Sequence, residues 1–407
     1  MVKKVKFNLS KKVKKPRLKH IAVFVLIIAV YLVGLNVGEG NIRFSSMNNI
    51  NKGLSSNIDY SSVNQLYQLL RNNYDGNLTN TQVLDGLKTG LANSTNDPYT
   101  EYFSASQTKA FNDELNGSFS GIGAQMGKNS DGQIIIETPI AGFPAEKAGL
   151  KAQDIVTEIN GTSTTNMLID VAVNKIRGPI NTYVSLSVVR DKSQRLTFKI
   201  KRENITVPSV NSKVINNNIG YIQITQFTQD TGDLAAKAAQ QLKDKKVKGI
   251  VLDLRGNPGG LVDAALKVCN LWLSSGQLIM QDKAGDRVLD SYTADGANNV
   301  LNGIPTVILI DGGSASAAEI TAGALHDNNV AEIVGVKSFG KGVEQKIFNL
   351  SDGAEAKITV AKWYRPNGSN IQHKGITPDK IVTITQSEIA NGNDTQLNAA
   401  TQIIENK

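Results

Sequence analysis

The feature that most constrains the fold is the alternation of apolar strands with amphipathic helices from residue 219 to about residue 385. The predicted strands are GYIQITQF, KGIVLDL, PTVILID and AEIVGV. The predicted helices between them are TGDLAAKAAQQLK, GLVDAALKVCNLWL and ASAAEITAGALH. Near-continuous apolar strands separated by such helices are typical of a largely parallel sheet covered on both faces. We therefore predict an α/β domain, with limits at residues 203–385.

A different pattern, of short strands between Gly, Asn and Asp turns, covers residues 117–202 and predicts a small, partly open β domain. Its strands are SGIGAQM, QIIIET, DIVTEING and YVSLSVVR, with helices at PAEKAG and MLIDVAVNKIRG. Residues 59–116 contain helical apolar spacing at Val63–Leu70 and Val83–Leu91. Residues 386–407 are predicted to be a C-terminal tail.

The net charge of +8 is concentrated at the N-terminus. Residues 1–20 hold eight lysines, one arginine and no acid, which leaves a net charge of −1 on the other 387 residues. This distribution and the 6% aromatic content give no support for nucleic-acid binding. The uncharged run Ile21–Gly38 would reach ~27 Å as a helix, close to the thickness of the hydrocarbon core.

The flanking charges predict the orientation of this span. Cations before it place residues 1–20 in the cytoplasm and the remainder outside, on a single-pass protein of the cell membrane. A cleaved signal peptide is the alternative, but the run is long and no Ala-x-Ala-like site follows it. Residues 39–58, rich in Asn, Ser and Gly, are predicted to be a linker.

Candidate chemistry begins at residues 309–326, where a strand, two glycines and a helix follow one another (LID-GGSASAAEITAGALH). Backbone N–H groups at a helix start are unpaired and attract negative charge. A serine there can attack a carbonyl while these groups receive the oxyanion. The competing interpretation is that Ser314 or Ser316 only caps the helix. The turn RGNPGG after another strand can also present N–H groups, and Asp253 and Arg255 could form a structural pair there.

The serine needs a base, and only three histidines exist. His20 precedes the predicted span, and His326 lies ~15 Å along the helix from Ser316. His373 lies in a polar loop, so a Ser–His–Asp triad stays open without a supporting spacing. Lys341, flanked by glycines after the strand AEIVGV, can serve instead if burial makes its amine neutral.

Two further features of the sequence have simpler explanations. Gly335–Lys341 has the spacing of a phosphate-binding loop, but Gly342 stands where a Ser or Thr should bind magnesium. The single cysteine, Cys269, lies in an apolar helical stretch and is predicted to be an inert core thiol.

Four stretches together make the chain resemble the C-terminal processing peptidases, or tail-specific proteases, over roughly residues 60–385. They are NDPYTEYFS, SGIGA with PAEKAGLKAQDIVTEINGT, LDLRGNPGGL, and GGSASAAEI followed by GVKSFGKGVEQ. The resemblance implies a multidomain α/β fold with a ClpP/crotonase-like core and a mixed, largely parallel sheet. It also implies that residues 117–202 are an inserted PDZ domain.

The resemblance also implies roles for individual residues. Ser316 would be the nucleophile, Lys341 the base and Gln345 the residue that helps to orient it. Glu319 would support the site. Ala317 and Gly260 would supply the oxyanion hole. Two departures are Ala318, where relatives often have serine, and Lys337, which replaces a common glutamate and is expected to perturb the pKa of Lys341.

In the PDZ-like domain, the resemblance implies a loop that binds a chain-terminal carboxylate while the substrate adds a strand. That loop comprises Gly121, Ile122, Gly123 and Ala124. Arg177, a cation in a Gly/Pro turn, is a candidate for a gating contact with the protease domain.

The function expected is a serine endopeptidase that cleaves exported proteins near unstructured C-termini. Its partners would be peptide substrates with free C-terminal tails, without metal, cofactor or nucleic acid. The alternatives are a membrane-tethered PDZ adaptor with an inactive hydrolase domain and, more weakly, a lipase-like hydrolase, because GGSAS lacks the G-x-S-x-G elbow. The sequence leaves a monomer and a homo-oligomer open.

Overall fold

The computed structural model describes residues 58–407 apart from residue 130, residue 192, residues 386–387 and residues 389–391. The predicted basic segment and membrane span, and the linker up to residue 57, lie outside the described residues. No helix among the described residues combines the length and the apolar character that crossing a bilayer requires. The described residues divide into two units between Thr79 and Asn80.

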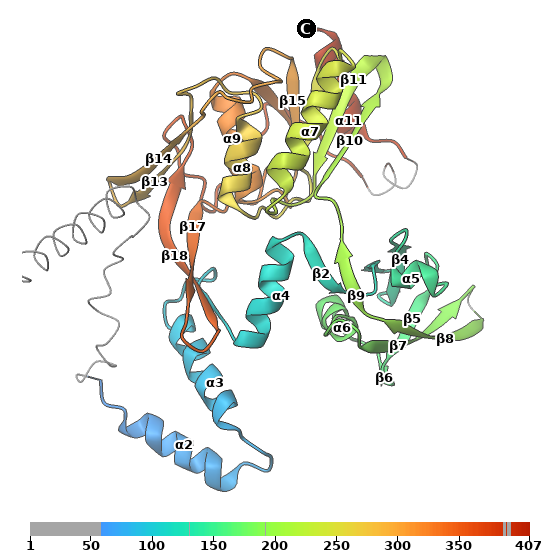
Figure 1. Ribbon diagram of the computed structural model, residues 1–407, viewed down its shortest axis with the longest axis vertical. Coiled ribbons are helices and arrows are strands. Elements are labelled where there is room, and N and C mark those ends of the chain that lie inside the picture. Colours follow the sequence, from blue (N-terminus) through green and yellow to red (C-terminus); the bar gives the residue numbers. More distant parts are fainter. Residues whose placement is uncertain (1–57, 130, 192, 386–387, 389–391) are drawn as a thin grey trace, which may run out of the picture. The chain divides into compact units, whose positions relative to one another are not determined.

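The described part of the first unit is mainly one helix, α2 (Ser61–Asn73; Figure 1), as the apolar spacing predicted. Its apolar side chains, including Leu66 and Leu69, are exposed. The second unit begins with α3 (Asn80–Asn93). Tyr102 anchors α3 to the rest of this unit, because its hydroxyl donates to Asp85 and accepts from Lys88.

The central sheet of the second unit has the strand order β10-β11-β12-β15-β16-β19 and is parallel except for β10. The strands are β10 (Val210–Ile215), β11 (Ile219–Ile224), β12 (Ile250–Asp253), β15 (Thr306–Ile310), β16 (Ala331–Gly335) and β19 (Lys380–Ile381). The predicted parallel sheet is therefore confirmed.

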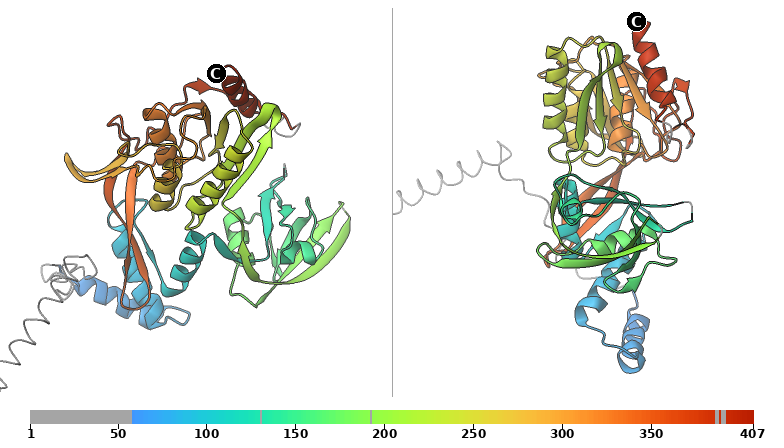
Figure 2. Two further views of the ribbon diagram at one scale, coloured as in Figure 1. Left: turned by 45° about the horizontal axis from the view of Figure 1, so that its top comes forward. Right: turned by 90° about the vertical axis from the view of Figure 1, so that its right-hand side faces the viewer.

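Helices cover both faces of this sheet (Figure 2, right). One face carries α7 (Thr231–Asp244), α8 (Val262–Cys269) and α9 (Ala317–Asp327). The other carries α11 (Thr395–Glu405). Because successive strand residues point to opposite faces, Leu252 packs with the first group and Val251 with α11. The prediction of a tail at residues 386–407 is therefore wrong for α11, which buries Ala400 and Ile404 against the sheet.

A second sheet, of five antiparallel strands, was not predicted from the sequence. Its order is β1-β18-β13-β14, with β17 also paired to β18. The strands are β1 (Glu101–Phe103), β13 (Leu278–Ala284), β14 (Arg287–Thr293), β17 (Val343–Asn349) and β18 (Glu355–Tyr364).

The β domain predicted at residues 117–202 has its own apolar core. Its antiparallel sheet has the order β3-β4-β5-β7-β8, with β6 paired to β5. These strands are β3 (Ala124–Lys128), β4 (Ile134–Pro139), β5 (Ile155–Ile159), β6 (Thr162–Ser163), β7 (Tyr183–Arg190) and β8 (Gln194–Lys201). The remaining elements of this region are α4 (Ala105–Leu115), α5 (Pro144–Lys147), α6 (Ile169–Ile176) and a two-stranded ladder of β2 (Ser118–Gly121) with β9 (Glu203–Thr206).

Candidate active site

Ser316 occupies a strained turn between β15 and α9. Its φ of 53° and ψ of −115° lie outside the regions that L-residues usually adopt. Such a conformation costs on the order of 1–3 kcal/mol and is found mostly where function requires it. Hydrogen bonds hold the residues before this turn in place: Asp311 Oδ1 accepts from the N–H groups of Gly256 (2.8 Å) and Gly313 (2.9 Å). A serine that only capped the helix would not need this backbone strain.

Glu319, one turn into α9, ties the serine to the lysine loop. Its Oε2 accepts from the N–H groups of Ser316 and Lys341, each at 2.9 Å. Its Oε1 accepts from Ser338 Oγ (2.5 Å) and Gly340 N (2.8 Å). The side chain is 1% exposed, and this burial raises the pKa of Glu319 while the four hydrogen bonds oppose the rise. One buried carboxyl group therefore sets the position of both candidate catalytic segments.

Lys341 lies on the loop between β16 and β17, and its carbonyl accepts from the indole of Trp363 (2.9 Å). Its Nζ lies 4.9 Å from the centroid of the Tyr99 ring. Burial lowers the pKa of Lys341, and the nearby Lys357 lowers it further, against the opposite effect of three acids. The perturbing cation is thus Lys357 on β18. The side chain of Lys337, which was expected to perturb this pKa, is exposed on the loop and is not among the main groups that shift it. A strand follows Lys341, so the phosphate-loop spacing has no helix behind it.

Ser316 and Lys341 line one pocket of about 340 Å³, together with Gly260 and Gln345. Both residues line this pocket, and the structure places no hydrogen bond between Ser316 Oγ and Lys341 Nζ. Gln345 Nε2 donates to Thr359 Oγ1 (3.2 Å) and to a backbone carbonyl rather than to the lysine.

The turn at Gly259 and Gly260 runs directly beside the serine. A Cβ on Gly259 would lie 2.8 Å from the Cβ of Ser316, and one on Gly260 would lie 2.1 Å from the carbonyl oxygen of Phe227. Only glycine permits this approach, at φ of 100° and 139°. The N–H groups of Gly260 and Ala317 donate to no other described residue. Both therefore remain available to an oxyanion beside Ser316.

No described histidine lines the pocket that contains Ser316. The ring of His326 contacts Asp327 and Asp379, each at 3.0 Å, and the ring of His373 contacts Gln372 at 3.2 Å. The structure therefore contradicts the Ser–His–Asp alternative. Cys269 is fully buried, and its thiol pKa is raised by that burial to about 12, as expected for a core residue.

The loop Gly121–Ala124 of the β domain presents backbone N–H groups that have no partner among the described residues. The N–H groups of Ile122 and Gly123 donate to no described residue, while the carbonyl of Ile122 accepts from Ala145 (2.7 Å). Gly123 has φ of 73°, and a Cβ there would lie 2.4 Å from the Cβ of Phe143. The amides are thus free and the loop is held by its carbonyls.

Arg177 lies over the ring of Phe119, with its Cζ 5.0 Å from the centroid. Both residues line a small pocket of about 160 Å³ that also includes Gln226 and Thr228. These two residues flank Phe227, whose backbone bonds the Gly259–Leu261 turn. Arg177 therefore shares a pocket with the residues on either side of Phe227, which supports the Gly259–Leu261 turn.

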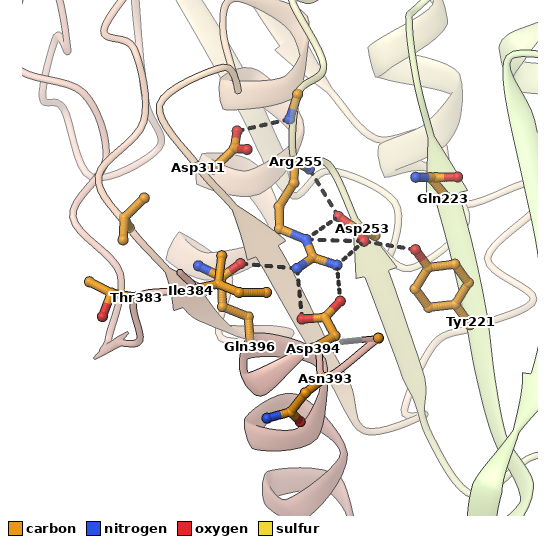
Figure 3. A pocket seen from close by; sticks show the side chains of 13 residues that line it. Tyr221, Gln223, Asp253, Arg255, Asp311, Thr383, Ile384, Asn393, Asp394 and Gln396 are labelled. Carbon is orange, nitrogen blue, oxygen red and sulfur yellow. Dashed lines mark hydrogen bonds and ion pairs between the residues drawn. The ribbon is translucent and has the colours of Figure 1, made fainter. Parts of the chain in front are cut away.

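Sequence reasoning missed one part of this region, a pocket of about 640 Å³ at the carboxyl ends of β11 and β12 (Figure 3). The predicted pair of Arg255 and Asp253 is present (2.6 Å), but Arg255 also binds Asp394 (2.8 Å) from the start of α11. Tyr221 donates to Asp253 (2.7 Å). The two carboxylates, the guanidinium and the hydroxyl group bind one another through these ion pairs and hydrogen bonds. The cluster therefore joins the start of α11 to the turn that follows β12. No local spacing in the sequence links residue 394 to residue 255.

Comparisons with known proteins agree with this arrangement. Residues 218–382 match the model of peptidase family S41, and residues 111–189 match that of the PDZ domain. The chain is 41% identical over 297 residues to the carboxy-terminal processing protease CtpA of Bacillus subtilis, covering 73% of this chain and 63% of that protein. It is 40% identical over 293 residues to a probable CtpA-like serine protease of Staphylococcus aureus, covering 72% and 58%.

The chain thus spans about three-fifths of the length of these relatives. The solved structure of a photosystem II D1 C-terminal processing protease matches with a TM-score of 0.51 and 28% identity, over 79% of this chain and 87% of that one. Residues 218–382 are therefore a domain of peptidase family S41, preceded in the same chain by a PDZ domain at residues 111–189.

Proposed function

We propose that this chain is a serine endopeptidase that cleaves proteins near free C-terminal tails captured by its PDZ domain. The observation that carries the proposal is the pocket shared by Ser316 and Lys341, with both backbones held by Glu319. The names of the similar proteins, which are processing proteases, support the same activity.

In the proposed reaction, neutral Lys341 accepts the proton of Ser316 Oγ as that oxygen attacks the substrate carbonyl carbon. The oxyanion accepts hydrogen bonds from the N–H groups of Ala317 and Gly260. Lys341 then gives its proton to the leaving amine as the C–N bond breaks. Lys341 then removes a proton from a water molecule, which attacks the acyl ester. Lys341 returns this proton to Ser316 Oγ as the ester bond breaks, and the serine is regenerated. Gln345, which donates a hydrogen bond to Thr359, positions the part of the pocket wall that β17 forms.

The PDZ domain supplies substrate selection in this proposal. A terminal carboxylate accepts hydrogen bonds from the amides of Ile122 and Gly123, and the tail adds a strand to the domain. Arg177 gates the protease domain through the residues on either side of Phe227. We further propose that residues 21–38 anchor the enzyme in the cell membrane with the catalytic domain outside, because of the charge pattern at the N-terminus.

The test is cleavage of a labelled peptide with a free apolar C-terminus. Ser316→Ala and Lys341→Ala are each expected to abolish cleavage while leaving the fold intact by circular dichroism. Lys337→Ala, which removes an exposed lysine from the same loop, is the matched control and should retain activity. Substantial cleavage by either active-site variant contradicts the mechanism. Binding of the peptide without cleavage by the wild-type protein would instead favour a PDZ adaptor with an inactive hydrolase domain.

A further inference from the structure

Two carboxyl side chains beside the active-site pocket contain buried oxygens without a hydrogen-bond partner. Asp282 on β13 is 3% exposed, and its Oδ1 has no partner among the described residues. Oε2 of Glu344 on β17 is in the same condition. Native proteins leave few buried polar atoms unpaired, and each exception requires an explanation.

The register of the antiparallel sheet places these two side chains on one face. Asp282 lies opposite Trp363, and Glu344 lies opposite Ala361, on the two sides of β18. Trp363 and Ala361 are two residues apart and so point the same way. The small side chain of Ala361 leaves room for the carboxyl groups to approach each other over β18. A proton shared between them accounts for both unpaired oxygens, and burial together with Asp282 raises the pKa of Glu344 to about 8.

Glu344 is also part of the wall of the pocket that contains Ser316. Much of the remaining wall is apolar, formed by Leu261, Val262, Met280, Ile320, Val343 and Trp363. Two cations line the same pocket, but Lys357 is already paired with Glu101, and Lys341 acts as a neutral amine in the proposed mechanism. The carboxyl pair keeps one negative charge when it shares a proton, so the pocket combines apolar walls with an anionic group that neither of these two cations pairs with.

We propose that Glu344, backed by Asp282, determines specificity by favouring a lysine or arginine side chain of the substrate next to the cleaved bond. The aliphatic stem of such a residue contacts the apolar wall, and its cation meets the carboxyl pair. The inference rests on the proposed function, since it concerns the substrate of that reaction.

The test uses matched peptides with a free C-terminus that carry either lysine or norleucine beside the cleaved bond, on each side in turn. Norleucine keeps the stem and removes the cation. We expect kcat/KM to favour lysine by about ten-fold or more on one side of the bond, as a site built for a polar group discriminates against its absence. Glu344→Gln and Asp282→Asn should each reduce this ratio severalfold. Asp286→Asn, which removes an exposed carboxylate from the β13–β14 turn, is the control and should leave the ratio unchanged.

The pH dependence of the ratio gives a readout that a merely structural role would not change. The ionisation of Lys341 cancels, because both peptides use the same base. Loss of the shared proton gives the pair a second negative charge, so the lysine preference should rise as pH increases through about 8. The neighbouring groups are Asp290 and Tyr292 on β14 and Lys346 on β17. In Glu344→Gln the ratio should not vary with pH.

The outcomes separate this inference from the function on which it rests. Cleavage of both peptides with no preference for lysine on either side, or a preference that survives Glu344→Gln, overturns the specificity proposal alone. Failure of the wild-type protein to cleave either peptide contradicts the proposed function, and with it this inference.

Discussion

Glu319→Gln is the substitution that most sharply tests how the site is assembled. The carboxyl group accepts four hydrogen bonds in a site that is 1% exposed. An amide keeps only one of the two accepting oxygens, so two donors lose their partner in either orientation of the amide. A buried donor left unpaired costs about 1–3 kcal/mol, so the free energy of unfolding should fall by about 2–6 kcal/mol.

The assay for this variant is urea unfolding followed by tryptophan fluorescence. The chain has two tryptophans, Trp272 and Trp363, and both are buried in the core that surrounds α9. The same variant should lose at least about ten-fold in kcat, because small displacements of positioned groups are costly. Glu332→Gln, on the neighbouring strand β16 and partly exposed, is the control and should shift unfolding by less than about 1 kcal/mol. Unchanged unfolding and unchanged kcat in Glu319→Gln would refute this account of the site.

Three further predictions follow from the same geometry. Lys357→Met should raise the pKa of Lys341, because a neighbouring cation disfavours the ammonium form. The acidic limb of the plot of kcat/KM against pH should therefore move to higher pH. A limb that stays in place contradicts the assignment of Lys341 as the base. Gly260→Ala should reduce peptide cleavage by on the order of 100-fold or more, since its Cβ would collide with backbone and displace an oxyanion donor, whereas wild-type rates would exclude that role. Asp394→Asn should destabilise the protein by about 1–3 kcal/mol at pH 7 by weakening the ion pair with Arg255. Burial raises the pKa of Asp394, but its hydrogen bonds to Arg255 and a backbone amide lower this pKa more. The stabilisation should therefore be lost as pH falls through the lowered pKa. Identical curves of stability against pH for the wild type and Asp394→Asn would contradict this prediction.

The four inner strands of the parallel sheet, β11, β12, β15 and β16, could be predicted because they are largely buried on both faces and are therefore mostly apolar. The segments that form β13, β14 and β18 gave no such signal, since they mix charged and apolar residues and pair with partners far away in the sequence. Helix α11 was assigned to a tail because only its contact with the sheet distinguishes it from a polar segment.

The site was predictable in part. The pattern indicated a serine at a helix start and a glycine-flanked lysine, and the resemblance to the C-terminal processing peptidases singled out Ser316. The structure places Ser316 and Lys341 in one pocket. The groups that modify the lysine could not be found in this way. Lys357 and Tyr99 approach Lys341 from separate strands and loops, and their proximity depends on the register of the antiparallel sheet. The Glu344–Asp282 pair could not be predicted from the sequence for the same reason, because strand β18 lies between the strands that carry the two residues.

The most direct test of the central claim is rapid-quench mass spectrometry of the enzyme with a slowly hydrolysed peptide ester. A peptidyl adduct should form on Ser316, and it should form faster at higher pH because the rise in pH deprotonates Lys341. Lys341→Met should form the adduct at least about 100-fold more slowly, the usual contribution of a general base. An adduct on another residue, or equally fast acylation without the Lys341 amine, would contradict the account.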